Sequence, residues 1–206
     1  MKGQTIGVIG GTGSGKSSLV NLIPRLYDAT QGEVLVDGVN VKDYDIEALR
    51  NKVGIVMQKA VLFKGTIREN MWMGKKGATD EQIDEALEIS QSKEFVDSKQ
   101  GRLDYVIEQG GKNLSGGQRQ RLTIARAIVR KPDVLILDDS ASALDFATDA
   151  ALRKAIRGMN NSPTVFIVSQ RAASLMYADL IIVLDDGQVA GMGTHDELLA
   201  NCEVYK

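Results

Sequence analysis

The stretch that decides the fold is Gly10-Gly11-Thr12-Gly13-Ser14-Gly15-Lys16-Ser17, which follows the apolar run of residues 6–9. It fits the pattern G-x-x-x-x-G-K-[ST], a phosphate-binding loop between a strand and a helix. Glycines let successive backbone N–H groups face an anion that side chains would otherwise exclude. We expect Lys16 to reach the outer phosphates of a nucleoside triphosphate and the Ser17 hydroxyl to ligate Mg²⁺. The predicted phosphate-binding residues are Gly11, Thr12, Gly13, Ser14, Gly15, Lys16, Ser17 and Ser18.

The composition narrows the class of protein. A chain of 206 residues suits one domain, or one domain with a small appended lobe. The 25 basic and 27 acidic residues give a formal net charge of −2 without a basic block, so nucleic acid is not an expected partner. The longest apolar runs, at 134–137 and 180–184, are too short to cross a bilayer, and we expect no transmembrane domain in this chain. The single cysteine, Cys202, excludes an internal disulfide and fits a reducing compartment.

The order of apolar segments predicts an α/β fold. After the strand before the phosphate loop, further strands are expected at residues 33–37, 53–57, 134–138, 164–168 and 180–185. Helices are expected from Lys16, over residues 46–52, within 66–100, over 115–130, 148–159 and 172–177, and after Thr194, with a loop at 99–112. Strands that alternate with helices indicate a mostly parallel sheet, and the helical stretch in the middle indicates a separate helical subdomain.

Two further motifs predict chemistry beside the phosphate loop. Asp138 ends the apolar strand, where a carboxylate suits Mg²⁺ or its water ligands. Ser115 is a good helix N-cap, and Gly116 and Gly117 leave the start of that helix bare for an anion. The chain therefore has a second predicted anion site, at residues 114–118.

Together these motifs resemble the nucleotide-binding domain of ATP-binding cassette (ABC) transporters, and the resemblance covers almost the whole chain. The signature is residues 114–118, and residues 62–70 look specifically like the exporter branch. Gln58 stands where the family's Q-loop glutamine contacts Mg²⁺ and senses the γ-phosphate. Ser142-Ala143-Leu144-Asp145 matches the D-loop, and Gln170 occupies the switch position.

The resemblance implies a P-loop NTPase fold with ATP and Mg²⁺ as cofactors. It implies a single cassette over residues 1–206, with a core of about 1–65 and 133–206 and a helical signature subdomain of about 66–132. Metal contacts would come from Ser17, Gln58 and Asp138. Because two cassettes of this family pair head to tail, the second anion site would serve a neighbour's ATP; its residues are Ser115, Gly116, Gly117 and Gln118. The other implied partner is a membrane-spanning domain, which would place the cassette at the cytoplasmic face of the cell membrane.

Two departures from the family concern catalysis. The residue after Asp138 is Asp139, where the family's catalytic base is glutamate. Aspartate is shorter by one methylene, and misplacement of a catalytic group by about 1 Å can reduce a rate about 10²-fold. The switch histidine is replaced by Gln170, which cannot carry a proton near neutral pH. We interpret Asp139, Gln170 and Gln58 as the catalytic residues of a degenerate, slowly hydrolysing site in one half of a heterodimeric exporter.

Two other departures lie outside the catalytic residues. The family places an adenine-stacking aromatic upstream of the phosphate loop, and residues 1–9 contain none. We therefore expect the early antiparallel strands to be largely missing, and binding to be weak and poorly selective between ATP and GTP. The glutamate flanked by glycines that exporters carry before the signature is shifted or replaced at residues 108–111.

Two alternative functions remain at this point. A non-transport ABC ATPase of the DNA-repair type would need a long coiled-coil insertion, but only 97 residues separate Ser17 from Ser115 and they hold no sustained heptads. The ribosome-associated type usually carries two cassettes in one chain. A generic phosphate-loop kinase would leave residues 114–118 unexplained.

Overall fold

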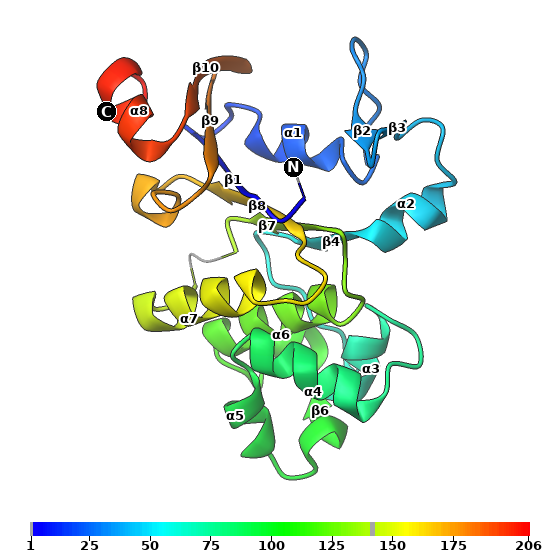
Figure 1. Ribbon diagram of the computed structural model, residues 1–206. Coiled ribbons are helices and arrows are strands. Elements are labelled where there is room, and N and C mark those ends of the chain that lie inside the picture. Colours follow the sequence, from blue (N-terminus) through cyan, green and yellow to red (C-terminus); the bar gives the residue numbers. More distant parts are fainter. Residues whose placement is uncertain (1, 141–142) are drawn as a thin grey trace. The chain divides into compact units, whose positions relative to one another are not determined.

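The computed structural model describes residues 2–140 and 143–206 (Figure 1). The chain forms two compact units. The first, here called the sheet unit, comprises residues 2–55, 133–139 and 164–206. The second, the helical unit, comprises residues 56–132, 140 and 143–163.

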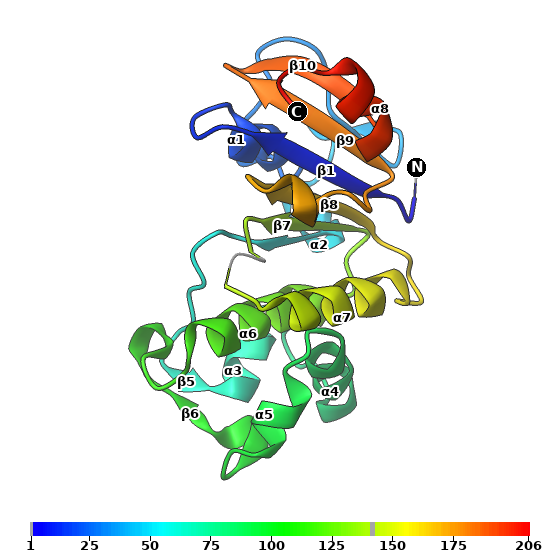
Figure 2. The same cartoon turned by 90° about the vertical axis from the view of Figure 1, so that its left-hand side faces the viewer.

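The sheet unit is built on six strands in the order β10-β9-β1-β8-β7-β4 (Figure 2). Their bounds are β1 (Thr5–Gly10), β4 (Val53–Val56), β7 (Val134–Asp138), β8 (Thr164–Ser169), β9 (Leu180–Asp185) and β10 (Gln188–Gly193). Strand β1 is parallel to β9 and β8, β7 is parallel to β8, and β10 runs antiparallel to β9 along the edge. The predicted mostly parallel sheet is confirmed.

The strands of the sheet unit are continuous apolar runs in the sequence because they are buried in the core of this unit. Strands buried on both faces show apolar residues at successive positions, and β7 has three buried residues in a row. Helix α1 (Lys16–Asn21) contributes its buried Val20 to this core. The buried cluster consists of Val8, Val20, Val53, Ile136, Val168 and Leu184.

Short elements complete the sheet unit. A hairpin of β2 (Leu35–Val36) and β3 (Val39–Asn40) turns at Asp37-Gly38. Helix α2 (Ile46–Lys52) has the predicted bounds, and the side chain of Asp45 caps it by accepting from the N–H of Ala48. The last helix, α8 (His195–Asn201), begins at the predicted Thr194–Glu197 capping box.

The helix predicted over 172–177 is wrong, because only the 3₁₀ turn Ala172–Ser174 forms there. The chain has to return at once to the start of β1. Asp179 donates its N–H to the carbonyl of Thr5, and its carboxylate accepts from the N–H of Thr5 at 2.7 Å. Leu175, between the turn and this anchor, is buried. These tertiary contacts leave no length for a regular helix.

The helical unit contains five α-helices among its described residues. They are α3 (Ile67–Trp72), α4 (Asp80–Ile89), α5 (Lys93–Asp97), α6 (Gly116–Ile128) and α7 (Phe146–Arg157). Capping boxes at Thr79 and Ser115 start α4 and α6, and Ser115 is the predicted N-cap. Helix α7 begins two residues earlier than predicted because Asp145 caps it by accepting from the N–H of Thr148.

The loop predicted over residues 99–112 is only partly correct. It contains the 3₁₀ turns Arg102–Asp104 and Gln109–Gly111, and between them β6 (Val106–Ile107), which pairs antiparallel with β5 (Gly65–Thr66). The sequence did not predict β6, because two residues are too few to show the alternation of apolar and polar side chains that marks a strand.

In the part of the chain that the structure describes, no helix combines the length and apolar character needed to cross a bilayer.

The buried strand β7 gives a stability prediction. Replacing Ile136, which is fully buried, with alanine should lower the free energy of unfolding by about 2–5 kcal/mol because it leaves a cavity in the core. The matched control is Val39→Ala at a position that is 44% exposed, where the change should stay within about 0.5 kcal/mol. Urea denaturation measures both. Equal losses would contradict the assignment of β7 to the core.

Candidate functional site

Three of the predicted site segments lie at one edge of the sheet. In the parallel register, Val8 of β1 and Asp138 of β7 both pair with Val168 of the intervening β8. Parallel strands end at the same edge, so the phosphate loop after β1, Gln170 after β8 and Asp139 after β7 leave the sheet side by side. Two strand spacings of about 4.8 Å separate the β1 and β7 backbones. The sheet unit therefore gathers these predicted residues within reach of one phosphate chain.

The phosphate loop has the backbone shape that its glycines predict. Gly13 and Gly15 have φ angles of +84° and +91°, in the left-handed region that glycine enters at little steric cost. The N–H of the buried Ser14 donates to the carbonyl of Gly11 at 3.2 Å, which closes the turn. Gly15 is the N-cap of α1 and provides no side-chain cap. The first N–H groups of α1 are thus left for another acceptor.

The ammonium group of Lys16 is held against the backbone of the phosphate loop. Its Nζ donates to the carbonyl oxygens of Gly10 at 2.8 Å and Gly11 at 2.7 Å. The side chain is half-buried, whereas Ser17 and Ser18 are exposed. An ammonium fixed against the loop backbone, with exposed hydroxyls beside it, suits an incoming polyphosphate.

The end of β7 presents two successive carboxylates with different backbones. Asp138 ends the strand in extended conformation, and Asp139 turns into the left-handed region with a φ of +45°. The N–H of Asp139 donates to the carbonyl of Val168 at 2.9 Å, so its backbone is tied to β8. Both side chains are half-buried. This conformation is uncommon for residues with a Cβ, and aspartate tolerates it better than most.

Gln170 follows β8 at the same edge and its side chain is exposed. The buried Ser169 fixes the turn, because its Oγ accepts from the N–H of Arg171 at 3.0 Å.

The predicted metal ligands that lie in the sheet unit are the Ser17 hydroxyl and the Asp138 carboxylate. Hard oxygen ligands of this kind suit Mg²⁺, which keeps several water or phosphate oxygens as further ligands. In residues 2–140 and 143–206 no cluster of three or more histidine, cysteine or acidic side chains is placed to hold a metal.

The second predicted anion site lies in the helical unit. Ser115 Oγ accepts from the N–H of Gln118 at 3.2 Å, and Gln118 Oε1 accepts from the N–H of Ser115 at 3.0 Å. A Cβ added at Gly116 would meet nothing within 4 Å, and one at Gly117 would meet the carbonyl of Ala143 at 3.4 Å. The start of α6 is therefore bare on the side of Gly116.

The remaining predicted residues of the helical unit are Gln58 and those of the D-loop. Gln58 is exposed in the segment after β4. Of the D-loop residues, Ser142 lies outside the described part of the chain. Asp145 accepts from the N–H and the hydroxyl of Thr148, and these hydrogen bonds lower the pKa of its carboxyl. Phe146, the first residue of α7, is 88% exposed.

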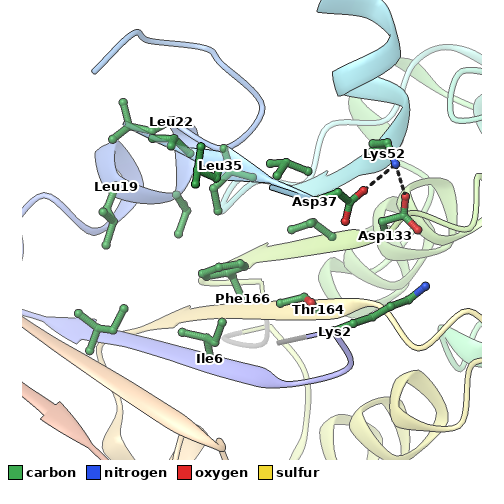
Figure 3. A pocket seen from close by; sticks show the side chains of 16 residues that line it. Lys2, Ile6, Leu19, Leu22, Leu35, Asp37, Lys52, Asp133, Thr164 and Phe166 are labelled. Carbon is green, nitrogen blue, oxygen red and sulfur yellow. Dashed lines mark hydrogen bonds and ion pairs between the residues drawn. The ribbon is translucent and has the colours of Figure 1, made fainter. Parts of the chain in front are cut away.

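The sheet unit also has two hollows that sequence reasoning missed. The larger one, of about 720 Å³, lies between α1, the β2–β3 hairpin and the face of the sheet (Figure 3). At its rim Lys52 Nζ bonds Asp37 at 2.8 Å and Asp133 at 3.1 Å, and these hydrogen bonds raise the pKa of the ammonium. None of its lining residues comes from the glycine-rich loop itself. The smaller hollow adjoins that loop.

The fold and the loop define a phosphate-loop nucleotide-binding protein, and comparison with known proteins defines its family. The family model for ABC transporters matches residues 1–142. An uncharacterized ABC transporter ATP-binding protein of Mycobacterium tuberculosis is 45% identical over 206 residues, which cover 98% of this chain and 35% of that protein. A Staphylococcus aureus protein named as a multidrug export ATP-binding/permease protein is 40% identical over 205 residues, covering 100% and 36%.

A solved structure agrees with these relatives. A bacterial Atm1-family ABC exporter with ATP bound superimposes with a TM-score of 0.92 at 32% identity, covering 98% of this chain and 36% of that one. The chain thus spans about a third of the length of the relatives it matches. It belongs to the ABC transporter family.

The capping box at α6 gives a prediction that is independent of any ligand. Ser115→Ala removes the acceptor for the N–H of Gln118 and should lower the free energy of unfolding by about 1 kcal/mol. Ser115→Asn restores a capping oxygen and should recover most of that loss. Hydrogen exchange at the N–H of Gln118 should speed up in the alanine variant only. Equal protection in both variants would show that the cap contributes nothing.

Proposed function

We propose that this domain binds Mg-ATP at its own phosphate loop, hydrolyses it slowly, and powers export by pairing with a second cassette that has the faster site. The observation that carries the proposal is the shared sheet edge, where the phosphate loop, Gln170 and the two carboxylates emerge together. The exporter relatives support the coupling to transport.

Binding would rest mainly on backbone groups. The N–H groups of Gly13, Gly15 and the first turn of α1 would face the β- and γ-phosphates, with Lys16 against the outer oxygens. Ser17 and Asp138 would hold Mg²⁺, with Gln58 as the third contact. The metal, when bound, neutralises charge that builds up on the phosphates. Because these groups are all present, substitutions at positions 139 and 170 should spare binding.

The rate of hydrolysis would depend on how closely the Asp139 carboxylate can approach the attacking water. A general base must come within about 3 Å of the water it activates, directly or through one further water. Asp139 falls one methylene short of a glutamate whose backbone occupied the same position. Gln170 can donate a hydrogen bond to a γ-phosphate but cannot take up a proton near neutral pH. The expected result is a site that holds ATP and turns it over slowly.

The partners follow from the second anion site. The bare start of α6, with Ser115, Gly116, Gly117 and Gln118, would face the γ-phosphate of a nucleotide held by a second cassette. Asp145 and its neighbours in the D-loop would lie beside that contact. The membrane-spanning domain would be the other partner, and the cassette would work at the cytoplasmic face of the membrane.

Restoring the family's residues at positions 139 and 170 should restore hydrolysis at this site. In the complete heterodimer with the partner's base disabled, Asp139→Glu and Gln170→His together should raise single-turnover hydrolysis at this site by about ten- to 100-fold. Each change alone should do less, because the base and the switch act on one water. The readout is phosphate release from ATP preloaded on this subunit. The matched control is Asp139→Asn, which keeps the length and removes the charge, and it should lower the residual rate. No gain from the double change would show that the partner's signature limits the rate.

A change at the second anion site of this chain should affect hydrolysis of the nucleotide held by the partner cassette. Gly117→Asp should abolish turnover in the heterodimer, because its carboxylate would repel the partner's γ-phosphate in a partly buried interface. Nucleotide trapped on this chain should persist, since the phosphate loop is untouched. Gly117→Asn, of equal size and no charge, should retain far more turnover.

The converse change tests which site does the work. Lys16→Ala should empty this chain's loop and leave measurable turnover at the partner's site. The measurement is trapped nucleotide on each subunit together with single-turnover hydrolysis. If Gly117→Asp preserved turnover while Lys16→Ala abolished it, this chain would house the working site, and our interpretation of Asp139 and Gln170 would be wrong.

A further inference from the structure

The chain segment that carries Gln58 is held by polar side chains from two helices of the helical unit. The carbonyl oxygen of Val61 accepts from Arg126 Nη2 of α6 at 2.9 Å. Two residues further on, Asn70 of α3 accepts from the N–H of Phe63 and donates to its carbonyl oxygen, both at 3.0 Å. Asn70 is 1% exposed, so its hydrogen bonds are shielded from water. The backbone after Gln58 is therefore fixed to α6 and α3.

Arg126, in the last turn of α6, makes two contacts to this segment. Besides its hydrogen bond to Val61, its guanidinium carbon lies 5.9 Å from the centroid of the Phe63 ring, which is within the range of a cation–π contact. The side chains of Val61 and Phe63 are 44% and 51% exposed, and the buried Leu62 lies between them. Arg126 thus holds Val61, the anchored residue that is nearest in the sequence to Gln58.

Stability alone does not explain an arginine at this position. Burial lowers the pKa of the Arg126 guanidinium, because its charged form loses contact with water. Its Nη1 is buried too and has no hydrogen-bond partner among the described residues. A buried donor without an acceptor costs free energy, and a well-packed apolar side chain often stabilises such a place equally well. An apolar side chain could not, however, fix the direction of the Val61 carbonyl.

We propose that Arg126 is a positioning residue for hydrolysis, which acts by fixing the backbone that carries Gln58. The inference deepens the proposed function, on which it rests, because Gln58 is a metal contact there. Only residues 59 and 60 separate Gln58 from the anchored Val61. A chain spans at most about 3.3–3.6 Å per residue, so the Cα of Gln58 stays within about 11 Å of that anchor. A side chain on a restricted backbone loses less conformational entropy when it binds a metal.

Arg121, on the same helix, provides a control of the same chemistry. Its Nη1 donates to the carbonyl oxygen of Gln91 at 2.7 Å, and its guanidinium carbon lies 5.1 Å from the centroid of the Phe95 ring. Its Nε is buried and, in the part of the chain that the structure describes, has no hydrogen-bond partner. Both of these contacts lie in residues 91–95, far in the sequence from Gln58. Loss of either arginine should therefore disturb α6 similarly, but only Arg126 holds the Gln58 segment.

The test compares Arg126→Lys with Arg121→Lys in the complete heterodimer with the partner's base disabled, and the probe is Mg²⁺. Lysine keeps the charge and lacks the planar group of donors that both arginines use. Arg126→Lys should raise the Mg²⁺ concentration for half-maximal single-turnover hydrolysis by about tenfold, as expected for a residue that supports a metal contact. Arg121→Lys should leave it unchanged. Trapping of ATP at saturating Mg²⁺ should persist in both variants.

A double-mutant cycle shows whether Arg126 acts through Gln58. In a Gln58→Ala background, Arg126→Lys should cause no further shift in the Mg²⁺ dependence, because the side chain that it positions is gone. An equal shift in both backgrounds would overturn the inference. Phe63→Leu, which removes only the ring beside the guanidinium at an exposed position, should shift the dependence in the same direction by a smaller factor.

Amide hydrogen exchange in the peptide of residues 57–63 gives the structural readout and should speed up in Arg126→Lys only. Faster exchange there with an unchanged Mg²⁺ dependence would show that the anchor is merely structural and refute the role of Arg126. An equal shift in Arg121→Lys would trace the effect to the whole helical unit and refute it too. If hydrolysis were insensitive to Lys16→Ala, or its Mg²⁺ dependence to Gln58→Ala, the proposed function itself would fail at that residue.

Discussion

The constraint on which the site depends is the parallel register of β1, β8 and β7. Val8, Val168 and Asp138 lie in one row across the sheet, so the three chain segments that follow these strands leave at the same edge. Burial holds the register: Val8 and Ile136 are fully buried and Val168 nearly so. A slip by one residue would turn these side chains to the other face. The position of the phosphate loop relative to the two carboxylates is therefore a consequence of core packing.

In the proposed function, binding and hydrolysis would depend on different parts of this edge. Binding would use backbone N–H groups of the phosphate loop and Lys16, whose ammonium is already held by two loop carbonyls. Hydrolysis would depend on how far the Asp139 carboxylate extends from a backbone that is tied to β8. A shorter side chain at that position would change a catalytic distance without disturbing the loop. This separation explains how one cassette could keep nucleotide and lose speed.

Local sequence signals predicted the elements that form from local interactions. Strands β7 and β9 and helix α2 have the predicted bounds, since apolar runs and caps specify them directly. The N-cap at Ser115 and the last helix after Thr194 were also predicted correctly. Elements that depend on distant partners were missed. Strand β6 exists because it pairs with β5, and the chain after Ser174 turns early because Asp179 bonds Thr5. The left-handed backbone of Asp139 has the same origin, because its N–H is bonded to Val168 in a distant strand.

The most direct test of the account is to map where Mg-ATP meets this chain, by following backbone amide shifts in the NMR spectrum during a titration. We predict that the largest changes fall on Gly13, Gly15 and Lys16, because the phosphates would bind their N–H groups and draw the Lys16 ammonium away from the loop carbonyls. Smaller changes should reach the turn at Gly187. Changes confined to residues 115–118, with the phosphate loop unaffected, would contradict the account, because the nucleotide would then bind the helical unit alone.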